Sequence, residues 1–130
     1  MKISIITACY NSEKTISRTI KSILSQTYSN LELIIIDGAS TDRTLEIVDF
    51  YKNNITYIIS EKDNGIYDAL NKGLKKANGE IIAFLHSDDF YPNPKVLEHV
   101  INEFKIGNKV DIVLGDVAFL DDGKNIKRYY

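Results

Sequence analysis

The chain has 130 residues, of which 44% are hydrophobic and 26% are charged; these values predict one compact domain over 1–130 and disfavour disorder and coiled coil. Sixteen Lys and Arg against eighteen Asp and Glu give a net charge of −2, which offers no bulk attraction for nucleic acid. A single cysteine, Cys9, excludes an internal disulfide and a cysteine-rich zinc site. No apolar run approaches the roughly 20 residues that cross a bilayer, and no signal peptide is visible, so we expect a cytoplasmic protein.

Apolar runs of strand length alternate with segments of helical period along the first hundred residues. Strands are predicted at 3–7, 31–36, 55–59 and 81–85, and the helices between and after them at 16–24, 45–50, 66–77 and 94–104. Asn78-Gly79 ends the third helix and Gly107 the fourth. This order predicts an α/β fold with a mostly parallel sheet and helices on both faces.

The end of the chain differs in kind. Strand-like runs at 110–114 and 117–120 are nearly adjacent, residues 121–123 form a turn signal, and a returning strand is predicted at 126–130. These runs predict a mixed edge of the sheet that is cut short, and we expect the sequence to be a fragment or a truncated product.

Ligands of open α/β sheets bind beyond the carboxyl ends of the strands. The predicted ends are the segments 7–13, 37–40, 61–65 and 86–89, together with Asp116. Carboxylates recur in these segments, and carboxylates that share one rim repel each other unless a cation or a shared proton relieves them. The rim therefore predicts a divalent metal.

The adjacent pair Asp88-Asp89 is the sharpest single feature. Its carboxylates can offer hard oxygen ligands to Mg²⁺ or Mn²⁺ beside a bound diphosphate, although either aspartate can instead cap the following turn. The first strand-to-helix loop, 7–13, has no glycine, which excludes a P-loop and a dinucleotide fingerprint. A metal is then the main way to neutralise a nucleotide diphosphate at this rim.

Two more aspartates stand at strand ends. Asp37 is placed to accept hydrogen bonds from a base or ribose, with a helix-capping turn as the alternative. Asp63 precedes Asn64-Gly65, where a plain turn is equally compatible with the residues.

An ordered set of short motifs resembles the family 2 glycosyltransferases of GT-A fold, particularly the bacterial members that build O-antigen, capsule or exopolysaccharide. The motifs lie at 3–11, 25–28, 36–42, 63–73, 77–80 and 87–89. The resemblance covers nearly all of the chain and implies a GT-A, Rossmann-like sheet truncated at its C-terminal edge.

The resemblance also implies site residues. The residues expected to bind the nucleotide and donor sugar are Thr7, Ala8, Tyr10, Asn11, Glu13, Asp37, Asp63, Gly65, Asn71 and Asp88. Asp89, with Asp88, is expected to hold Mg²⁺ or Mn²⁺. In this family the catalytic base normally lies beyond the equivalent of Tyr130, so no catalytic residue is assigned within the chain.

The implied function is inverting, metal-dependent transfer of a sugar from a nucleoside-diphosphate sugar to a saccharide or lipid-linked acceptor in cell-surface polysaccharide synthesis. The chain alone is expected to bind the donor without efficient transfer, with peripheral association at the inner face of the plasma membrane. Two alternatives are a non-catalytic, Mg²⁺-binding receiver-like module and a sugar nucleotidyltransferase. A receiver-like module would require a lysine after 110–114, which this sequence lacks. A nucleotidyltransferase would require a glycine-rich, basic loop at 7–13, which is also absent from the sequence.

Overall fold

The computed structural model describes residues 1–106, 109–121 and 125–130. The chain forms two compact units, Met1–Glu98 and His99–Tyr130. Helix α4 (Val96–Ile106) begins in the first unit and continues into the second. The expected single domain over 1–130 stays a prediction, and each unit is described below by itself.

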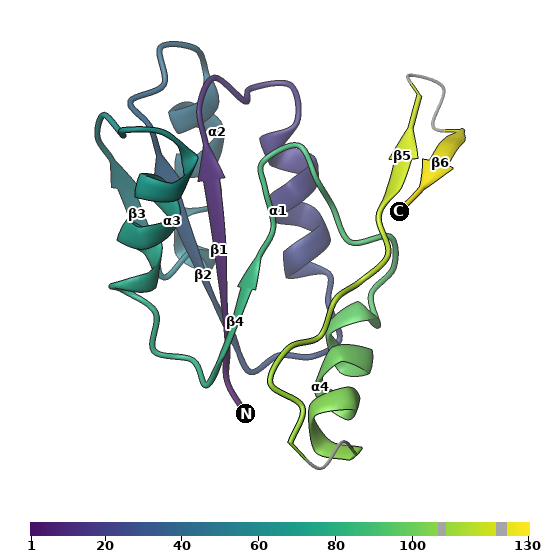
Figure 1. Cartoon of the computed structure of the whole chain (residues 1–130). Helices are drawn as coiled ribbons and strands as arrows, with labels where there is room; N and C mark the ends of the chain where they lie inside the picture. Colours follow the sequence, from purple (N-terminus) through teal and green to yellow (C-terminus); the bar gives the residue numbers. More distant parts are fainter. Residues whose placement is uncertain (107–108, 122–124) are drawn as a thin grey trace. The chain divides into compact units, whose positions relative to one another are not determined.

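A parallel sheet forms the centre of the first unit (Figure 1). Its strands are β1 (Ile3–Cys9), β2 (Leu31–Asp37), β3 (Tyr57–Ser60) and β4 (Ile81–Phe84), in the spatial order β3-β2-β1-β4. β1 and β2 pair along their whole length, so that Cys9 lies beside Asp37 at their carboxyl ends. Both central strands are almost completely buried, which explains their continuous apolar runs.

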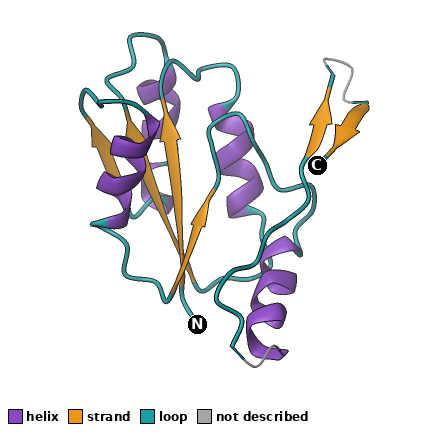
Figure 2. Cartoon of the chain, viewed as in Figure 1, coloured by secondary structure: helices purple, strands orange, loops and turns teal. Residues whose placement is uncertain are grey.

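Helices cover both faces of this sheet (Figure 2). α3 (Ile66–Leu74) packs on one face through a cluster of buried residues, namely Ile6, Ala8, Ile34, Ile36 and Ala69. The alternate residues of β1 and β2 point to the other face, where α1 (Ile16–Leu24) and α2 (Thr44–Phe50) contact each other. A 3₁₀ helix, η1 (Lys52–Asn54), connects α2 to β3. The predicted α/β class is confirmed.

Two glycines allow the backbone to approach its neighbours closely. A Cβ at Gly73 of α3 would lie 2.4 Å from Cγ2 of Ile6, and a Cβ at Gly79 would lie 2.6 Å from the backbone nitrogen of Ser4. Real Cβ atoms do not come so close, so Gly73 sets how near α3 lies to β1. Gly79 does the same for the turn that leads into β4.

The start of α4 is anchored by a buried glutamine. Gln26 Oε1 accepts a hydrogen bond from the Leu97 N–H at 3.1 Å, and Gln26 Nε2 donates to the Asn93 carbonyl at 2.8 Å. The helix begins at Val96, slightly after the predicted start at Pro94. The predicted stop at Gly107 lies outside the described residues.

The second unit contains an antiparallel hairpin of β5 (Ala118–Leu120) and β6 (Ile126–Tyr129), which confirms the predicted strand and returning strand. The two strands form a sheet of their own and do not extend the parallel sheet. The turn signal at 121–123 falls largely on residues outside the described part of the chain.

The predicted strand at 110–114 is wrong. This segment has no regular structure, and its side chains at Ile112 and Leu114 are 75% and 88% exposed. A strand requires a neighbour for its N–H and carbonyl groups, and none pairs with this segment among the described residues. Asp116, expected at a strand end, consequently follows an irregular segment.

Candidate active site

A cleft of about 1210 Å³ opens at the carboxyl ends of the strands in the first unit. Its walls are formed by residues 8–15 at and after the end of β1, by residues after β2 and around the start of α3, and by residues 86–88 after β4. The residues after β2 and around α3 are Gly38, Ala39, Asp42, Lys62, Asp63, Gly65, Ile66 and Ala69. The cleft lies where the topology of parallel strands places ligand sites.

The cleft brings together most of the predicted donor-binding residues. Those on its walls are Ala8, Tyr10, Asn11, Glu13, Asp63, Gly65 and Asp88. Thr7 and Asp37 are fully buried behind the walls, and the exposed Asn71 and Asp89 do not line the cleft. Lys14, Asp42 and Lys62 also line it, although none was singled out as a ligand contact from the sequence.

Asn11 and Glu13 connect the first loop to the loop after β2. Asn11 Oδ1 accepts a hydrogen bond from the Thr41 N–H at 2.8 Å, and the Asn11 N–H donates to Ser40 Oγ at 2.9 Å. Glu13 Oε2 accepts a hydrogen bond from the Arg43 N–H at 2.9 Å. Asn11 has a positive φ of 47°, a backbone conformation that asparagine tolerates better than most residues. Both side chains thus shape the cleft wall as well as facing it.

Asp37 holds three strand ends together. Its carboxylate accepts hydrogen bonds from the Ser40 N–H at 3.0 Å, from Ser60 Oγ at 2.7 Å and from Cys9 Sγ at 3.6 Å, and also from Ser40 Oγ. Burial, and next the charge of Asp37, raise the pKa of the Cys9 thiol well above its usual range. The inward orientation of Asp37 gives it a structural role, and its contact with a base or ribose stays a prediction.

Side chains of α1 form hydrogen bonds to the backbone around Asp88 and Asp89. Arg18 donates from Nη2 to the Asp88 carbonyl at 3.2 Å, while Thr19 Oγ1 lies 2.7 Å from the Asp89 carbonyl. The Asp89 N–H donates to the His86 carbonyl at 3.0 Å, which closes a turn. In the described residues, no hydrogen bond or ion pair reaches either carboxylate.

This arrangement leaves two adjacent carboxylates that form no ion pair in the described part of the chain. Partial burial, and then the charge of Asp88, raise the pKa of Asp89 above its ordinary value, with His86 and Arg18 acting in the opposite direction. Within the described residues no three His, Cys, Asp or Glu side chains form a complete metal cage. One or two carboxylates nevertheless fit Mg²⁺ or Mn²⁺ when phosphate oxygens complete the shell.

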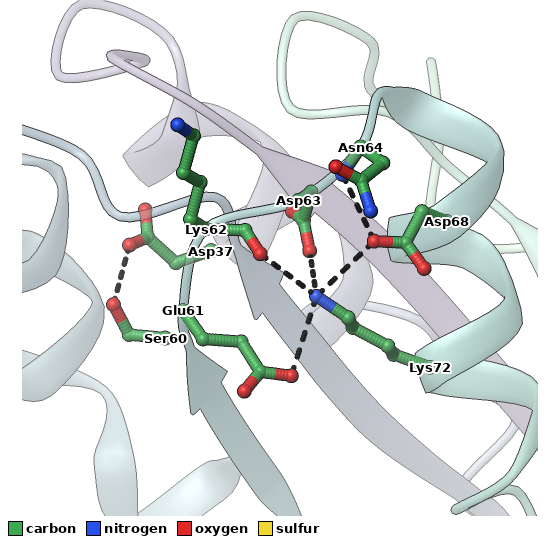
Figure 3. A network of polar contacts seen from close by, with 8 residues as sticks. All are labelled: Asp37, Ser60, Glu61, Lys62, Asp63, Asn64, Asp68 and Lys72. Atoms are coloured by element: carbon green, nitrogen blue, oxygen red, sulfur yellow. Dashed lines mark hydrogen bonds and ion pairs between the residues drawn. The ribbon is translucent and has the colours of Figure 1, made fainter.

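A cluster of charged residues supports the wall formed by the β3–α3 loop (Figure 3). Lys72 of α3 lies at its centre, 2.5 Å from Asp63 Oδ1, 3.2 Å from Glu61 Oε1 and 3.3 Å from Asp68 Oδ2. Sequence reasoning missed Lys72, although its spacing of four residues from Asp68 is a recognisable helical ion-pair signal.

The family model for glycosyl transferase family 2 matches residues 4–130. The chain therefore belongs to glycosyl transferase family 2. Its sequence is 45% identical over 101 residues to the Escherichia coli UDP-Glc:alpha-D-GlcNAc-diphosphoundecaprenol beta-1,3-glucosyltransferase WfaP, covering 75% of this chain and 39% of that enzyme.

Solved structures confirm the GT-A fold. Staphylococcus aureus TarS 1–349 in complex with UDP-GlcNAc superposes with a TM-score of 0.75 at 32% identity, covering 82% of this chain and 32% of TarS. The mannosyltransferase PcManGT from Pyrobaculum calidifontis, in complex with GDP-Man and Mn²⁺, also has a TM-score of 0.75, at 26% identity, covering 90% of this chain and 34% of the other.

The chain spans about half the length of the curated relatives that it matches. None of the helices in the described part of the chain is both long and apolar enough to cross a membrane.

Proposed function

We propose that this chain binds the nucleoside-diphosphate sugar donor of an inverting, metal-dependent glycosyltransferase that acts in cell-surface polysaccharide synthesis. The observation that carries the proposal is the pair Asp88-Asp89 in the loop after β4, whose carboxylates form no ion pair with any described residue and of which Asp88 lines the cleft. A divalent ion shared with a diphosphate would relieve the repulsion between these adjacent carboxylates.

The named relatives support this choice of ligand. TarS was solved with UDP-GlcNAc, and PcManGT with GDP-Man and Mn²⁺. WfaP is named for transfer to a diphosphoundecaprenol-linked sugar. By analogy we propose a saccharide or lipid-linked acceptor for this protein, with peripheral membrane association at the site of transfer. Family membership also disfavours the receiver-like and nucleotidyltransferase alternatives.

The residues at the cleft have different proposed roles in donor binding. Asp89 and Asp88 would hold Mg²⁺ or Mn²⁺, which when bound neutralises the departing nucleoside diphosphate. Tyr10, whose side chain is 62% exposed at the cleft, can stack against the base. Lys14 and Lys62 place ammonium groups on the cleft walls, where they attract the anionic donor. Inversion requires a carboxylate to deprotonate the acceptor hydroxyl, and we assign that base to no described residue.

Calorimetric titration with UDP in the presence of Mn²⁺ tests the proposal. We expect binding by the wild-type chain and at least about tenfold weaker binding by Asp89→Ala, because the substitution removes a direct metal ligand. Asp49→Ala, which removes an exposed carboxylate from α2, is the matched control and should bind as wild type does. Equal affinity for UDP in Mn²⁺ and in excess chelator would contradict the proposal.

A further inference from the structure

Lys72 is surrounded by acceptors from two elements. In addition to its three carboxylate neighbours, its ammonium donates to the Lys62 carbonyl at 3.2 Å (Figure 3). Only Asp68 belongs to the same helix as Lys72, whereas Glu61, Lys62 and Asp63 belong to the preceding loop. The lysine side chain is 20% exposed. These contacts tie the loop after β3 to the last turn of α3.

Asp63 lies between Lys72 and Gly38. Its Oδ1 atom contacts Lys72, and its Oδ2 atom would lie 3.0 Å from a Cβ placed on Gly38, so that the glycine gives the carboxylate room. The Asp63 side chain is 10% exposed and lies on the cleft wall. Its carboxylate is therefore held by the Lys72 ammonium next to the turn after β2.

The Lys72 ammonium also contacts Asp68, which holds the backbone of the same loop. Asp68 Oδ2, 3.3 Å from Lys72, accepts a hydrogen bond from the Asn64 N–H at 2.9 Å. Asn64 precedes Gly65, which has a φ of 95° and lines the cleft. Without Lys72, three carboxylates would face one another across this loop, and their repulsion would displace it.

Exposed ion pairs contribute little to stability because solvent screens the attraction between their charges. The Lys72 cluster differs because Lys72 and Asp63 are both largely shielded and because one cation serves three anions. The hydrogen bond to Asp63, followed by those to Glu61 and Asp68, raises the pKa of Lys72 above its usual value against the opposing effect of burial. Lys72 is therefore charged at every physiological pH.

We propose that Lys72 is a positioning residue for donor binding: it holds the 61–65 loop and the Asp63 carboxylate on the cleft wall without itself lining the cleft. This inference rests on the proposed function, because it assigns the fixed loop to the nucleotide-sugar site. Lys72→Met keeps most of the aliphatic length and removes the charge, whereas Lys72→Arg retains the charge.

Calorimetry with UDP and Mn²⁺ measures the effect on the donor site. We expect about tenfold weaker binding by Lys72→Met, recovery to within about threefold by Lys72→Arg, and no change in Lys75→Met, which removes a neighbouring ammonium from the end of α3. In an Asp63→Asn background, Lys72→Met should weaken binding by less than about threefold, because the carboxylate that it orients is already gone. Unchanged affinity in Lys72→Met, or an undiminished effect in the Asp63→Asn background, would overturn the inference.

Hydrogen exchange without nucleotide separates this inference from the proposed function. The Asn64 amide should exchange faster in Lys72→Met than in the wild type or Lys75→Met, while the amides of β1 keep their protection. Absence of UDP binding by the wild-type chain would contradict the proposed function and with it the role of Lys72 in donor binding. Unchanged exchange at Asn64 would show that Lys72 does not hold the loop.

Discussion

Glu32 is a carboxylate, 3% exposed, near the start of β2. It pairs with Lys2 Nζ at 2.6 Å and accepts hydrogen bonds from Ser4 Oγ at 2.6 Å and the Asn78 N–H at 2.7 Å. Burial opposes its ionisation, but these three partners outweigh burial and lower the pKa of Glu32 to about 2. The ionised group thus connects the beginning of β2 to the chain before β4.

We expect Glu32→Gln to lower the free energy of unfolding by about 3 kcal/mol at pH 7, since each pKa unit corresponds to about 1.4 kcal/mol. The folded pKa lies below the unfolded value of 4.5, so the contribution is complete above the unfolded pKa and is lost as the pH falls toward about 2. Urea unfolding at pH 7 and at pH 3 should therefore show a smaller effect of the substitution at pH 3.

The control for this prediction is Glu46→Gln, which removes an exposed carboxylate paired with Arg43. Its effect on stability should be small at both pH values. An equal loss of stability for Glu32→Gln at pH 7 and pH 3 would show that the charge of Glu32 is not what stabilises the fold.

At single residues, composition and motif order indicated which side chains bear charge near the cleft, but not what they bind. Asp88 and Asp89 were identifiable because they lie in the short loop after a predicted strand. The contacts of Asn11 and Glu13, and that of Asp37 with Ser60, were not, because these partners lie 23 to 30 residues away in the chain. Hydrogen bonds of that kind depend on the folded backbone.

At the scale of elements, the contact between α3 and β1 depends on a missing side chain. Gly73 of α3 is buried, and the Cβ of any other residue would collide with Ile6. Helical propensity favours alanine over glycine by about 1 kcal/mol, so packing and propensity make opposite predictions for a substitution here.

We expect packing to prevail, so Gly73→Ala should lower the free energy of unfolding by about 1–3 kcal/mol, as overpacked core substitutions do. Chemical denaturation measures this difference. Lys75→Ala, at the exposed end of the same helix, should change stability by less than about 0.5 kcal/mol. A more stable Gly73→Ala variant would show that α3 can move away from β1 without cost.

The elements themselves were largely predictable, because a buried parallel strand is a continuous apolar run and a covering helix has a period of 3.6. The exception, 110–114, is instructive: its composition is that of a strand, but pairing defines a strand, and pairing requires a neighbour that composition does not reveal. The same segment therefore has strand-like residues without strand structure.

At the scale of the whole molecule, the first unit contains every described residue of the cleft. Binding at this cleft should therefore stabilise that unit against unfolding, because a ligand that binds only the folded state shifts the equilibrium toward it. UDP with Mn²⁺ at a hundred times its dissociation constant should add about 2.7 kcal/mol.

Thermal unfolding followed by circular dichroism tests this linkage. We expect the melting temperature to rise by several degrees with UDP and Mn²⁺ together, and to return when a chelator is added. Mn²⁺ alone should have a smaller effect, because the carboxylate pair lacks the phosphate oxygens that complete the coordination. A shift that persists in chelator would mean that UDP binds without the metal.

By itself the sequence determined the parallel α/β architecture, the family, and the position of an acidic pair after the fourth strand, because periodicity, strand order and local motifs are properties of neighbouring residues. Only the tertiary structure decided that Asp37 turns inward, that Lys72 joins α3 to the loop beside the cleft, and that 110–114 forms no strand. Each of these outcomes depends on which distant groups the fold brings within hydrogen-bonding or packing distance, and no local pattern along the chain encodes that distance.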